Sequence, residues 1–291
     1  MASSETAEDK FYFEHEAPYA EWKLWWDSEG RSAYDSQRPD VTVDCVVLTY
    51  DAEAKNVVDS LRFLAVRRKT HPFIGQWALP GTYLRSDEES ADESVARLLG
   101  WLFADPVEGN ARIQQIRTFT GAKRDPRGQT ASVLHAVYLT GAMSMRLNDE
   151  VDGRWLTLSD YDGGVDLEEA GPEDAGDSQS MDVTAFDHQS MLRLVTLRLR
   201  DQFSWTPNVF YTLPESFTVT EAIRLRCSLY ADSDVHKVNR KNFLKKFAGL
   251  WDEAGSVDPD DPRSQRLYSV QSKRGLAIEP GRRRQPQRMS A

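Results

Sequence analysis

Hydrophobic residues in the first half of the chain recur mainly at the spacing of β-strands. Residues 41–50 form a nearly continuous β-branched run, which is typical of a buried strand. A short strand is predicted at the end of residues 72–84, after a loop. Further strands are predicted at residues 61–69, 115–123, 132–142 and 153–160. Residues 85–103 have helical spacing instead, so the pattern predicts an α/β fold.

The helix predicted at residues 85–103 begins with polar residues and continues with an apolar face. Ser86 and Glu89 stand at the spacing of a capping box, in which two side chains satisfy each other's backbone N–H groups. The apolar face consists of Ala91, Val95, Leu98, Leu99 and Leu102. This face predicts that the helix packs against the sheet.

The second half of the chain has a mainly helical pattern. Residues 163–183 are rich in glycine and acid and poor in large apolar residues, which predicts a linker. A helix is expected at residues 184–203, and two more helices joined by a short turn at residues 214–251. Thr218 and Glu221 form a second capping box, which opens the first helix of this pair.

The second helix of the pair, from Asn239 to about Leu250, has two contrasting faces. Its apolar face consists of Phe243, Phe247 and Leu250, with Leu244 at the edge. Its polar face consists of Lys241, Asn242, Lys245 and Lys246, with Arg240 in the first turn. A recognition helix in the DNA major groove needs such a docked apolar face and such a basic one. Residues 252–270 are expected to form a wing, whose acidic tip leaves Arg263 and Arg266 as its DNA contacts.

Charge is divided unequally along the 291 residues. The net charge of −10 alone argues against a nucleic-acid partner. However, residues 181–291 carry 18 Lys and Arg against 13 Asp and Glu, a balance of +5. The remaining residues have a balance of −15. Halves of opposite sign indicate different partners, and the basic half suits DNA.

Other features of the sequence exclude several classes of protein. No apolar run approaches the roughly 18 residues that a membrane-spanning helix needs. The acidic N-terminus does not have the pattern of a secretory signal. The two cysteines, Cys45 and Cys227, stand far apart, so we expect neither a disulfide framework nor a zinc site. A reducing cytoplasm is the expected location.

The loop before the first helix reads Trp77-Ala78-Leu79-Pro80-Gly81 and is followed by Glu88 or Glu89. This arrangement resembles the front of the Nudix hydrolase box. That box continues as Arg-Glu-hydrophobic-x-Glu-Glu, whose glutamates share one helix face and hold Mg²⁺ against a pyrophosphate. Here Arg97 is followed by Leu98, Leu99, Gly100, Trp101 and Leu102, and no acid occurs between Glu93 and Asp105. We therefore expect no catalytic residue and no tightly bound metal.

Basic residues in this acidic half gather near the same loop. Arginine suits planar, bidentate contacts with phosphate, so the expected ligand is an anion such as a nucleotide-sugar diphosphate. Phe73 and Trp77 flank the glycine loop and either pack on a base or ribose or belong to the core. The predicted ligand-binding residues are Arg67, Arg68, Phe73, Trp77, Gly81, Arg124 and Arg127. The alternative is that these cations balance acidic neighbours at the surface.

A series of landmarks runs through both halves of the chain in a fixed order. They are residues 38–51, 63–84, 124–128, 185–203, 204–221 and 239–247, ahead of 266–268. In this order and spacing the chain resembles the Nudix-related transcriptional regulators, the NrtR-like repressors of bacterial NAD metabolism. The resemblance implies a Nudix-like α/β/α sandwich with a mixed sheet at residues 38–162 and a winged helix-turn-helix domain at 184–272. An extension at residues 1–37 and a basic tail at 273–291 lie outside it.

The resemblance also implies a function. It implies a homodimer that binds an inverted-repeat operator in double-stranded DNA and regulates genes of NAD or related metabolism. ADP-ribose or a similar small phosphorylated metabolite would bind the Nudix-like domain and release the DNA. DNA contacts are expected at Thr218, Thr220, Lys237, Arg240, Lys241, Asn242, Lys245, Lys246 and Arg266.

Several alternatives stay open at this point. The chain departs from the family at Thr82, which stands where the family has a second glycine. Some members of the wider group respond to sugar metabolism, so a regulator of sugar catabolism with a different effector is one alternative. A Nudix hydrolase of ADP-ribose or another nucleoside diphosphate derivative is the second. An interaction protein whose C-terminal domain binds protein is the third.

Overall fold

The computed structural model describes residues 39–271, apart from residues 86–88, 108, 122, 159–184 and 262, together with six residues nearer the N-terminus. The chain forms two compact units, residues 1–40 and 41–291. In the first unit, the backbone N–H groups of Ala17 and Glu21 donate to the carbonyls of Tyr12 and Pro18, each over 3.0 Å. The predicted linker, the predicted basic tail and most of the predicted N-terminal extension lie outside the described residues.

The second unit is built on a mixed sheet. Its strands are β1 (Asp40–Tyr50), β2 (Leu61–Arg67), β3 (Trp77–Ala78), β4 (Gly81–Tyr83), β5 (Ala111–Phe119), β6 (Thr130–Leu139) and β7 (Gly153–Thr157). The order is β3-β2-β1-β6-β5, with β4 paired to β1 and β7 paired to β2. β1 and β6 run in the same direction, because Asp44 bonds Ser132 near their starts and Thr49 bonds Leu139 near their ends. The pairs β1–β2, β1–β4, β2–β3, β2–β7 and β5–β6 are antiparallel.

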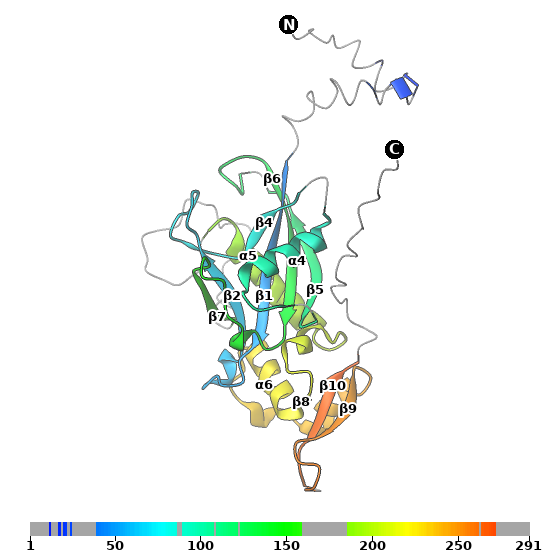
Figure 1. Ribbon diagram of the computed structural model, residues 1–291. Coiled ribbons are helices and arrows are strands. Elements are labelled where there is room, and N and C mark those ends of the chain that lie inside the picture. The colour runs from blue at the N-terminus through cyan, green and yellow to red at the C-terminus, as the bar shows by residue number, and fades with distance from the viewer. Residues whose placement is uncertain are drawn as a thin grey trace, which may run out of the picture. The chain divides into compact units, whose positions relative to one another are not determined.

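Helices cover both faces of this sheet (Figure 1). Alternate residues of β1 point to opposite faces, as the two-residue period of a strand requires. On one face Val43, Cys45 and Val47 pack with the helix α4 (Ala91–Leu102). On the other face Val46, Leu48 and Tyr50 pack with α5 (His188–Gln202). The predicted Nudix-like α/β/α sandwich is therefore confirmed.

The start of α4 differs from the prediction. The structure places the capping box at Ser90 and Glu93 rather than at Ser86 and Glu89. The hydroxyl of Ser90 accepts the backbone N–H of Glu93, and the Glu93 carboxylate accepts the backbone N–H of Ser90. The sequence contains two Ser-x-x-Glu patterns four residues apart, and the helix uses the second.

The position of helix α5 also differs from the predicted domain division. The prediction assigned residues 184–203 to the C-terminal domain. In the structure its buried residues Met191, Leu192, Val195 and Leu199 belong to one hydrophobic cluster with β1, β2 and the elements that follow. The sheet and the C-terminal part thus share a core.

The C-terminal part has the element order of a winged helix. Its elements are the 3-10 helix η5 (Asn208–Thr212), β8 (Phe217–Thr218), α6 (Val219–Leu229), η6 (Val235–Lys237), α7 (Arg240–Phe247), β9 (Trp251–Ser256) and β10 (Arg266–Val270). The strands form a sheet in the order β8-β10-β9, so the wing expected at residues 252–270 is present. Two further 3-10 helices, η2 (Val57–Asp59) and η3 (Ala142–Ser144), lie in loops of the large sheet.

An aromatic cluster holds the winged helix together. The rings of Phe203, Phe210, Phe243, Phe247 and Trp251 lie 4.8 to 6.4 Å apart, at angles typical of aromatic packing. Phe203 follows α5 directly, so this cluster joins that helix to α7.

Two expectations about the whole chain can be compared with the structure. Cys45 and Cys227 are both free and buried. In the part of the chain that the structure describes, no helix has the length and apolar character needed to cross a membrane.

Candidate functional sites

The glycine loop lies between the central strand β1 and the start of α4. The backbone N–H of Cys45 donates to the carbonyl of Pro80 over 2.9 Å, which fixes the loop to β1. A Cβ atom on Gly81 would collide with the Asp44 carboxylate. Only glycine therefore fits here without moving the Asp44 carboxylate.

An ion pair connects this loop to α4. Arg97 donates to both carboxylate oxygens of Glu89, over 2.9 and 2.6 Å. It also donates to the Thr82 hydroxyl over 3.0 Å and to the Tyr83 carbonyl over 2.9 Å. The hydrogen bonds from Arg97 lower the pKa of Glu89 to about 2. The structure thus identifies Glu89 as the partner of Arg97, the arginine of the box. Thr82 serves as a hydrogen-bond acceptor. Glu88 lies outside the described residues.

The three positions where the box has its metal-binding glutamates hold Leu98, Trp101 and Leu102. Leu98 and Leu102 are buried in the cluster between α4 and the sheet. The side chain of Trp101 is 48% exposed. Among the described residues, no group of three or more His, Cys, Asp or Glu side chains has an arrangement that could hold a metal ion. Side chains of this kind at these positions do not fit a magnesium site.

A small polar pocket of about 120 Å³ lies on the α5 side of the glycine loop. We call it the arginine pocket. It is lined by Thr42, Asp44, Arg68, Leu79, Gly81, Thr82, Tyr83, Arg124, Asp125, Arg127, Phe186 and His188. It therefore brings together strand β1, the glycine loop, the loop between β5 and β6, and the start of α5.

Acids already neutralise two arginines of this pocket. Arg124 donates to both oxygens of Asp187 over 3.0 and 2.8 Å, and it lies 3.8 Å from Asp44. Arg127 forms an ion pair of 2.6 Å with Asp125. An anionic ligand must therefore compete with these carboxylates for the guanidinium groups.

Arg68 and Phe186 line the arginine pocket, and Phe73 contacts Phe186. The Arg68 guanidinium lies 4.8 Å from the ring centroid of Phe186, and burial lowers its pKa from the ordinary value. Phe186 meets Phe73 edge to face at 4.7 Å. Both phenylalanines have left-handed backbone conformations, with φ of 55° and 62°. Bulky residues rarely adopt such conformations, which often cluster at binding sites.

His188 connects the glycine loop to the start of α5. Its Nδ1 accepts the backbone N–H of Leu79 over 2.9 Å, so the ring proton is on Nε2, 3.6 Å from the Asp44 carboxylate. Burial lowers the pKa of His188, which keeps the ring neutral. The sequence interpretation missed the contributions of Asp44, Asp125, Phe186, Asp187 and His188. The signal for Asp44 was a carboxylate inside an apolar strand; the segment with Phe186 to His188 was noticed only as a landmark.

Not all of the predicted ligand residues come together. Arg68, Gly81, Arg124 and Arg127 line the arginine pocket. Arg67 instead donates to the carbonyl of Gly75 over 2.8 Å and lines a separate groove. Phe73 reaches the arginine pocket only through its contact with Phe186. Trp77 is half-buried against the core under the Arg154 guanidinium, at 5.5 Å, and does not line the pocket.

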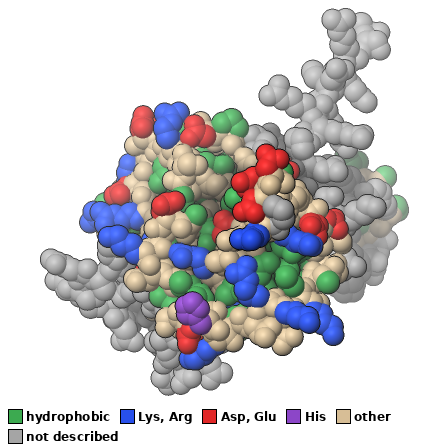
Figure 2. All heavy atoms as spheres, turned by 90° about the horizontal axis from the view of Figure 1, so that it is seen from below, with side chains coloured by type: hydrophobic (Ala, Val, Ile, Leu, Met, Phe, Trp, Pro, Cys, Tyr) green, Lys and Arg blue, Asp and Glu red, His purple; other side chains and the backbone are tan. Residues whose placement is uncertain are grey.

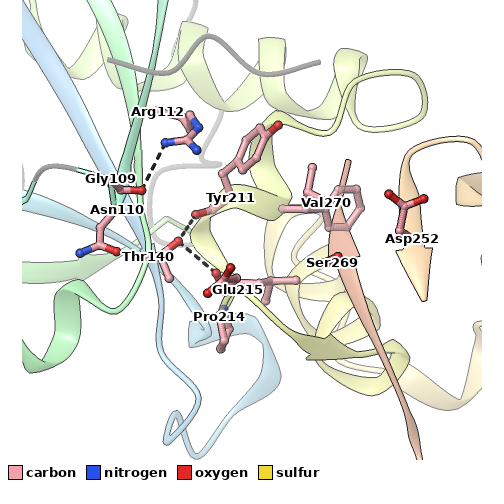
Figure 3. Close-up of a pocket in the computed structure, with 12 residues that line it drawn as sticks. Gly109, Asn110, Arg112, Thr140, Tyr211, Pro214, Glu215, Asp252, Ser269 and Val270 are labelled. Atoms are coloured by element: carbon pink, nitrogen blue, oxygen red, sulfur yellow. Dashed lines mark hydrogen bonds between the residues drawn. The ribbon is translucent and has the colours of Figure 1, made fainter. Parts of the chain in front are cut away.

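A second cavity of about 430 Å³ lies where the large sheet meets the wing (Figure 3). The hydroxyl of Thr140 donates to the carbonyls of Tyr211 and Leu213 and so ties β6 to η5. Among its lining residues Arg112 stands with Glu215 and Asp252. This mixture of charges gives the cavity no preference for an anion.

The helix α7 presents a basic face to solvent. Asn239 caps it, and Phe243 and Phe247 are buried in the aromatic cluster, with Leu244 half-buried. The predicted DNA-contacting residues of this helix are all exposed, namely Arg240, Lys241, Asn242, Lys245 and Lys246. Figure 2 shows the end of the molecule that carries α6 and the wing, with Lys and Arg side chains spread over its surface between apolar ones.

Some of the other predicted DNA contacts are already engaged. The Thr218 hydroxyl caps α6, accepting the backbone N–H of Glu221 and donating to its carboxylate. Arg240 donates to the Thr220 hydroxyl over 3.1 Å. Arg266 pairs with Glu253 across the wing at 3.0 Å, and Lys237 lies 3.5 Å from Asp234. Thr218, Arg266 and Lys237 are each bound to an acid that competes with phosphate, whereas Arg240 and Thr220 keep further donors beyond their mutual bond. Lys241 and Lys245 form no ion pair with any described residue.

The helix α5 connects the arginine pocket to the winged helix. Residues next to its start line the pocket. Near its end, Arg200 donates to the carbonyl of Leu229 in α6 over 2.7 Å, and the Tyr230 hydroxyl donates back to the Arg200 carbonyl over 2.8 Å. Phe203 then packs on Phe247 of α7, with ring centroids 5.4 Å apart. One helix thus contacts both candidate sites.

Comparison with known proteins also finds similarity to Nudix-related regulators. No family model matches the chain. The chain is 24% identical over 228 residues to the ADPR responsive transcriptional repressor NtrR of Acinetobacter baylyi, which is 78% of each protein. The crystal structure of a MutT/nudix family protein from Enterococcus faecalis has a TM-score of 0.73 and 28% identity, covering 94% of this chain and 100% of that one.

The fold also matches Shewanella oneidensis NrtR, with a TM-score of 0.59 and 24% identity over 81% of this chain and 99% of that one. The same protein complexed with a 27mer DNA matches with a TM-score of 0.59 and 23% identity, over 81% of this chain and 97% of that one. These matches span both the sandwich and the winged helix. The resemblance stated from the sequence is thereby confirmed: the chain is similar to the NrtR-like Nudix regulators in sequence and in fold.

Proposed function

We propose that the chain is a DNA-binding transcriptional regulator, a repressor, whose Nudix-like part binds a small phosphorylated metabolite that releases the DNA. The observation that carries the proposal is the exposed basic face of α7 on a winged helix whose core is continuous with the sandwich. Lysines on such a helix neutralise DNA phosphates, and asparagine pairs with adenine in the major groove.

The relatives support this proposal. The similar Acinetobacter protein is an ADPR responsive transcriptional repressor, and the similar Shewanella protein forms a complex with a 27mer DNA. By this similarity the effector is ADP-ribose or a related metabolite, and the target is double-stranded DNA. We propose further that the chain acts in the cytoplasm as a homodimer on an inverted repeat, because a two-fold dimer matches a two-fold DNA site.

The ion pairs of the arginine pocket suggest how the ligand acts. A phosphate group that takes Arg124 from Asp187 removes the bond between the β5–β6 loop and the residue before α5. The position of α5 then depends on the ligand, and its other end packs on α6 and α7. For release, the ligand must bind the DNA-free arrangement more tightly than the DNA-bound one.

The proposal includes the absence of hydrolysis. Buried leucines at two of the glutamate positions and a tryptophan at the third leave no carboxylates there to hold a metal. The site is then a sensor that needs no tightly bound metal. A Nudix hydrolase would instead release product from ADP-ribose in a Mg²⁺-dependent reaction that Glu89→Gln abolishes.

A fluorescence anisotropy titration tests the proposal. The full chain is titrated onto a labelled duplex from the promoter of its own gene neighbourhood, with and without ADP-ribose. We expect specific binding that ADP-ribose weakens. No binding at moderate salt contradicts the regulator. Binding that ADP-ribose leaves unchanged and a pentose phosphate weakens assigns the effector to sugar catabolism.

The charge variants make this test specific. Lys241→Ala with Lys245→Ala should weaken DNA binding, because both lysines lie on the exposed face of α7. Arg117→Ala, which removes an exposed charge from β5, should leave it unchanged. Equal effects of the two changes would assign DNA binding to general charge rather than to α7.

A further inference from the structure

A groove of about 480 Å³ lies beside the arginine pocket and shares Arg68, Leu79 and Gly81 with it. The remaining walls of the groove are formed by residues that do not line the arginine pocket. They are the end of β2 with Arg67, Lys69 and Thr70, the side chain of Trp101 on α4, and residues 150–152 before β7. We call it the Trp101 groove. Its volume is in the range of sites that hold small molecules, unlike that of the arginine pocket.

Trp101 is the unusual residue of this groove. Its helix neighbours Leu98 and Leu102 are buried, as expected for positions that pack on the sheet. Trp101 stands at a position of the box that otherwise carries a metal-binding glutamate, and 48% of its surface is exposed. An indole face that is half open to a groove offers a stacking surface for a planar aromatic group.

Among the described residues, the cations at the end of β2 donate to neutral acceptors only. Arg67 donates to the Gly75 carbonyl over 2.8 Å, and Lys69 donates to the Glu150 carbonyl over 2.6 Å. Neither forms an ion pair with a carboxylate of the described residues. A phosphate can therefore approach them without displacing an acid, in contrast to Arg124 and Arg127 in the arginine pocket.

The adjoining segment before β7 carries the exposed acids Glu150 and Asp152, and its carbonyls accept the Lys69 ammonium and the Arg67 backbone N–H. Carboxylates repel a second anionic group but accept hydrogen bonds from sugar hydroxyls. The groove thus combines an aromatic face, cations for one phosphate and acceptors for a sugar. These are the recognition groups of a nucleoside monophosphate.

We infer that the Trp101 groove binds the nucleoside monophosphate portion of the effector, with the base on Trp101 and the phosphate on Arg67 and Lys69, without a divalent metal. The inference rests on the proposed function, which supplies the phosphorylated ligand. In this arrangement, guanidinium and ammonium groups neutralise the phosphate where a hydrolase uses Mg²⁺. Arg68, which lines both cavities, lies between this portion and the arginine pocket.

Isothermal titration of the full chain with AMP and with ribose 5-phosphate, both in EDTA, tests the inference. Trp101→Ala should weaken AMP binding about tenfold, because stacking of one base contributes that much, and should leave ribose 5-phosphate unchanged. Arg67→Ala with Lys69→Ala should weaken both ligands about tenfold or more. Trp205→Ala, which removes an indole that is 60% exposed outside the groove, should change neither.

Three results would overturn the inference: equal AMP affinity of wild type and Trp101→Ala, AMP binding that needs Mg²⁺, or no AMP binding by the wild type. Thermal melts check that each variant is folded. Trp101→Phe, which keeps an aromatic face, should restore most of the AMP affinity that Trp101→Ala loses.

Release of DNA by ADP-ribose separates this inference from the proposed function. If ADP-ribose releases DNA from wild type and Trp101→Ala at the same concentration, the proposed regulatory function is supported and the inference about the Trp101 groove is wrong. If the wild type binds no DNA but binds AMP through Trp101, the inference about the Trp101 groove is supported and the proposed regulatory function is wrong.

Discussion

Two groups of positive charge in this chain differ in what neutralises them. In the arginine pocket, Arg124 pairs with Asp187 at 2.8 Å and Arg127 with Asp125 at 2.6 Å. On α7, Lys241 and Lys245 are exposed, and no acid among the described residues pairs with them. The positive charges of the first group are neutralised by acids of the same fold, whereas those of the second group have no such partner among the described residues.

The difference corresponds to two different tasks. DNA binding gains free energy when exposed cations release the counterions of the phosphates, so its charges work best unpaired. A ligand switch works by exchange of partners, so its charges are paired before the ligand arrives. Internal pairing is therefore favourable for the sensing role proposed for the arginine pocket and unfavourable for the DNA-binding role proposed for α7.

Removal of a buried partner should have the largest effect. Arg124→Ala leaves Asp187 and the buried Asp44 without their cation, and the Arg124 side chain is only 6% exposed. We expect the free energy of unfolding to fall by about 3 kcal/mol in urea denaturation. The matched control is Arg146→Ala, because Arg146 pairs with Asp105 over 3.3 Å with side chains 76% and 36% exposed, and its loss should cost less than about 1 kcal/mol. Equal losses would remove the distinction between buried and exposed pairs.

Removal of the unpaired charges should affect DNA binding rather than stability. Lys241→Ala with Lys245→Ala should weaken DNA binding by about 2 kcal/mol and reduce the salt dependence of the affinity by about two phosphate contacts. Titrations at several salt concentrations measure both quantities. The free energy of unfolding should change by less than about 0.5 kcal/mol, since both side chains are exposed. A salt dependence identical to wild type would show that these lysines do not contact phosphate.

The two threonines at the start of α6 should behave differently from each other. Thr218→Ala removes the N-cap and one half of the capping box, so it should cost about 1 kcal/mol of stability. Thr220 is exposed and bonds only Arg240 in the described structure, so Thr220→Ala should be nearly neutral for folding. Thermal unfolding of both variants checks this. A stability loss at Thr220 as large as that at Thr218 would contradict the assignment of the cap.

The smallest expected effect is a pH dependence that arises from His188. Burial lowers its pKa in the folded chain, despite the opposing influence of Asp44 and Asp187. The unfolded chain therefore binds the proton more readily, so stability is present above pH about 6.5 and is lost as the pH falls below it. His188→Asn should reduce the loss between pH 7.5 and 5.5 by less than about 1 kcal/mol. A loss equal to that of wild type would assign the pH dependence to other groups such as His135.

Elements with strong local patterns could be predicted from the sequence. The buried strand β1, the Thr218 cap, the Asn239 cap and the two faces of α7 follow from short-range spacing, and the structure confirms them. The start of α4 could not be chosen, because two capping-box patterns, Ser86 with Glu89 and Ser90 with Glu93, follow one another in the sequence. The structure uses Ser90 while Arg97 binds Glu89, a contact eight residues apart that no local pattern specifies.

The arginine pocket was less predictable, because its residues come from distant segments. The arginines near the glycine loop could be identified by residue type, but Asp187 lies 63 positions after Arg124. The acidic segment before α5 also suggested a domain boundary there, whereas the apolar residues of α5 pack on the sheet. Tertiary packing determines both the Arg124–Asp187 pair and the position of α5. Residue spacing along the chain does not predict such packing.

The acidic end of the wing bears on how much DNA one protomer covers. Asp258, Asp260 and Asp261 lie at the turn between β9 and β10, and all three are exposed. Carboxylates there repel the duplex, so we expect the DNA axis to incline away from the hairpin. In the proposed complex the DNA contact is then centred on α7, and the bases nearest the hairpin contribute little to operator choice.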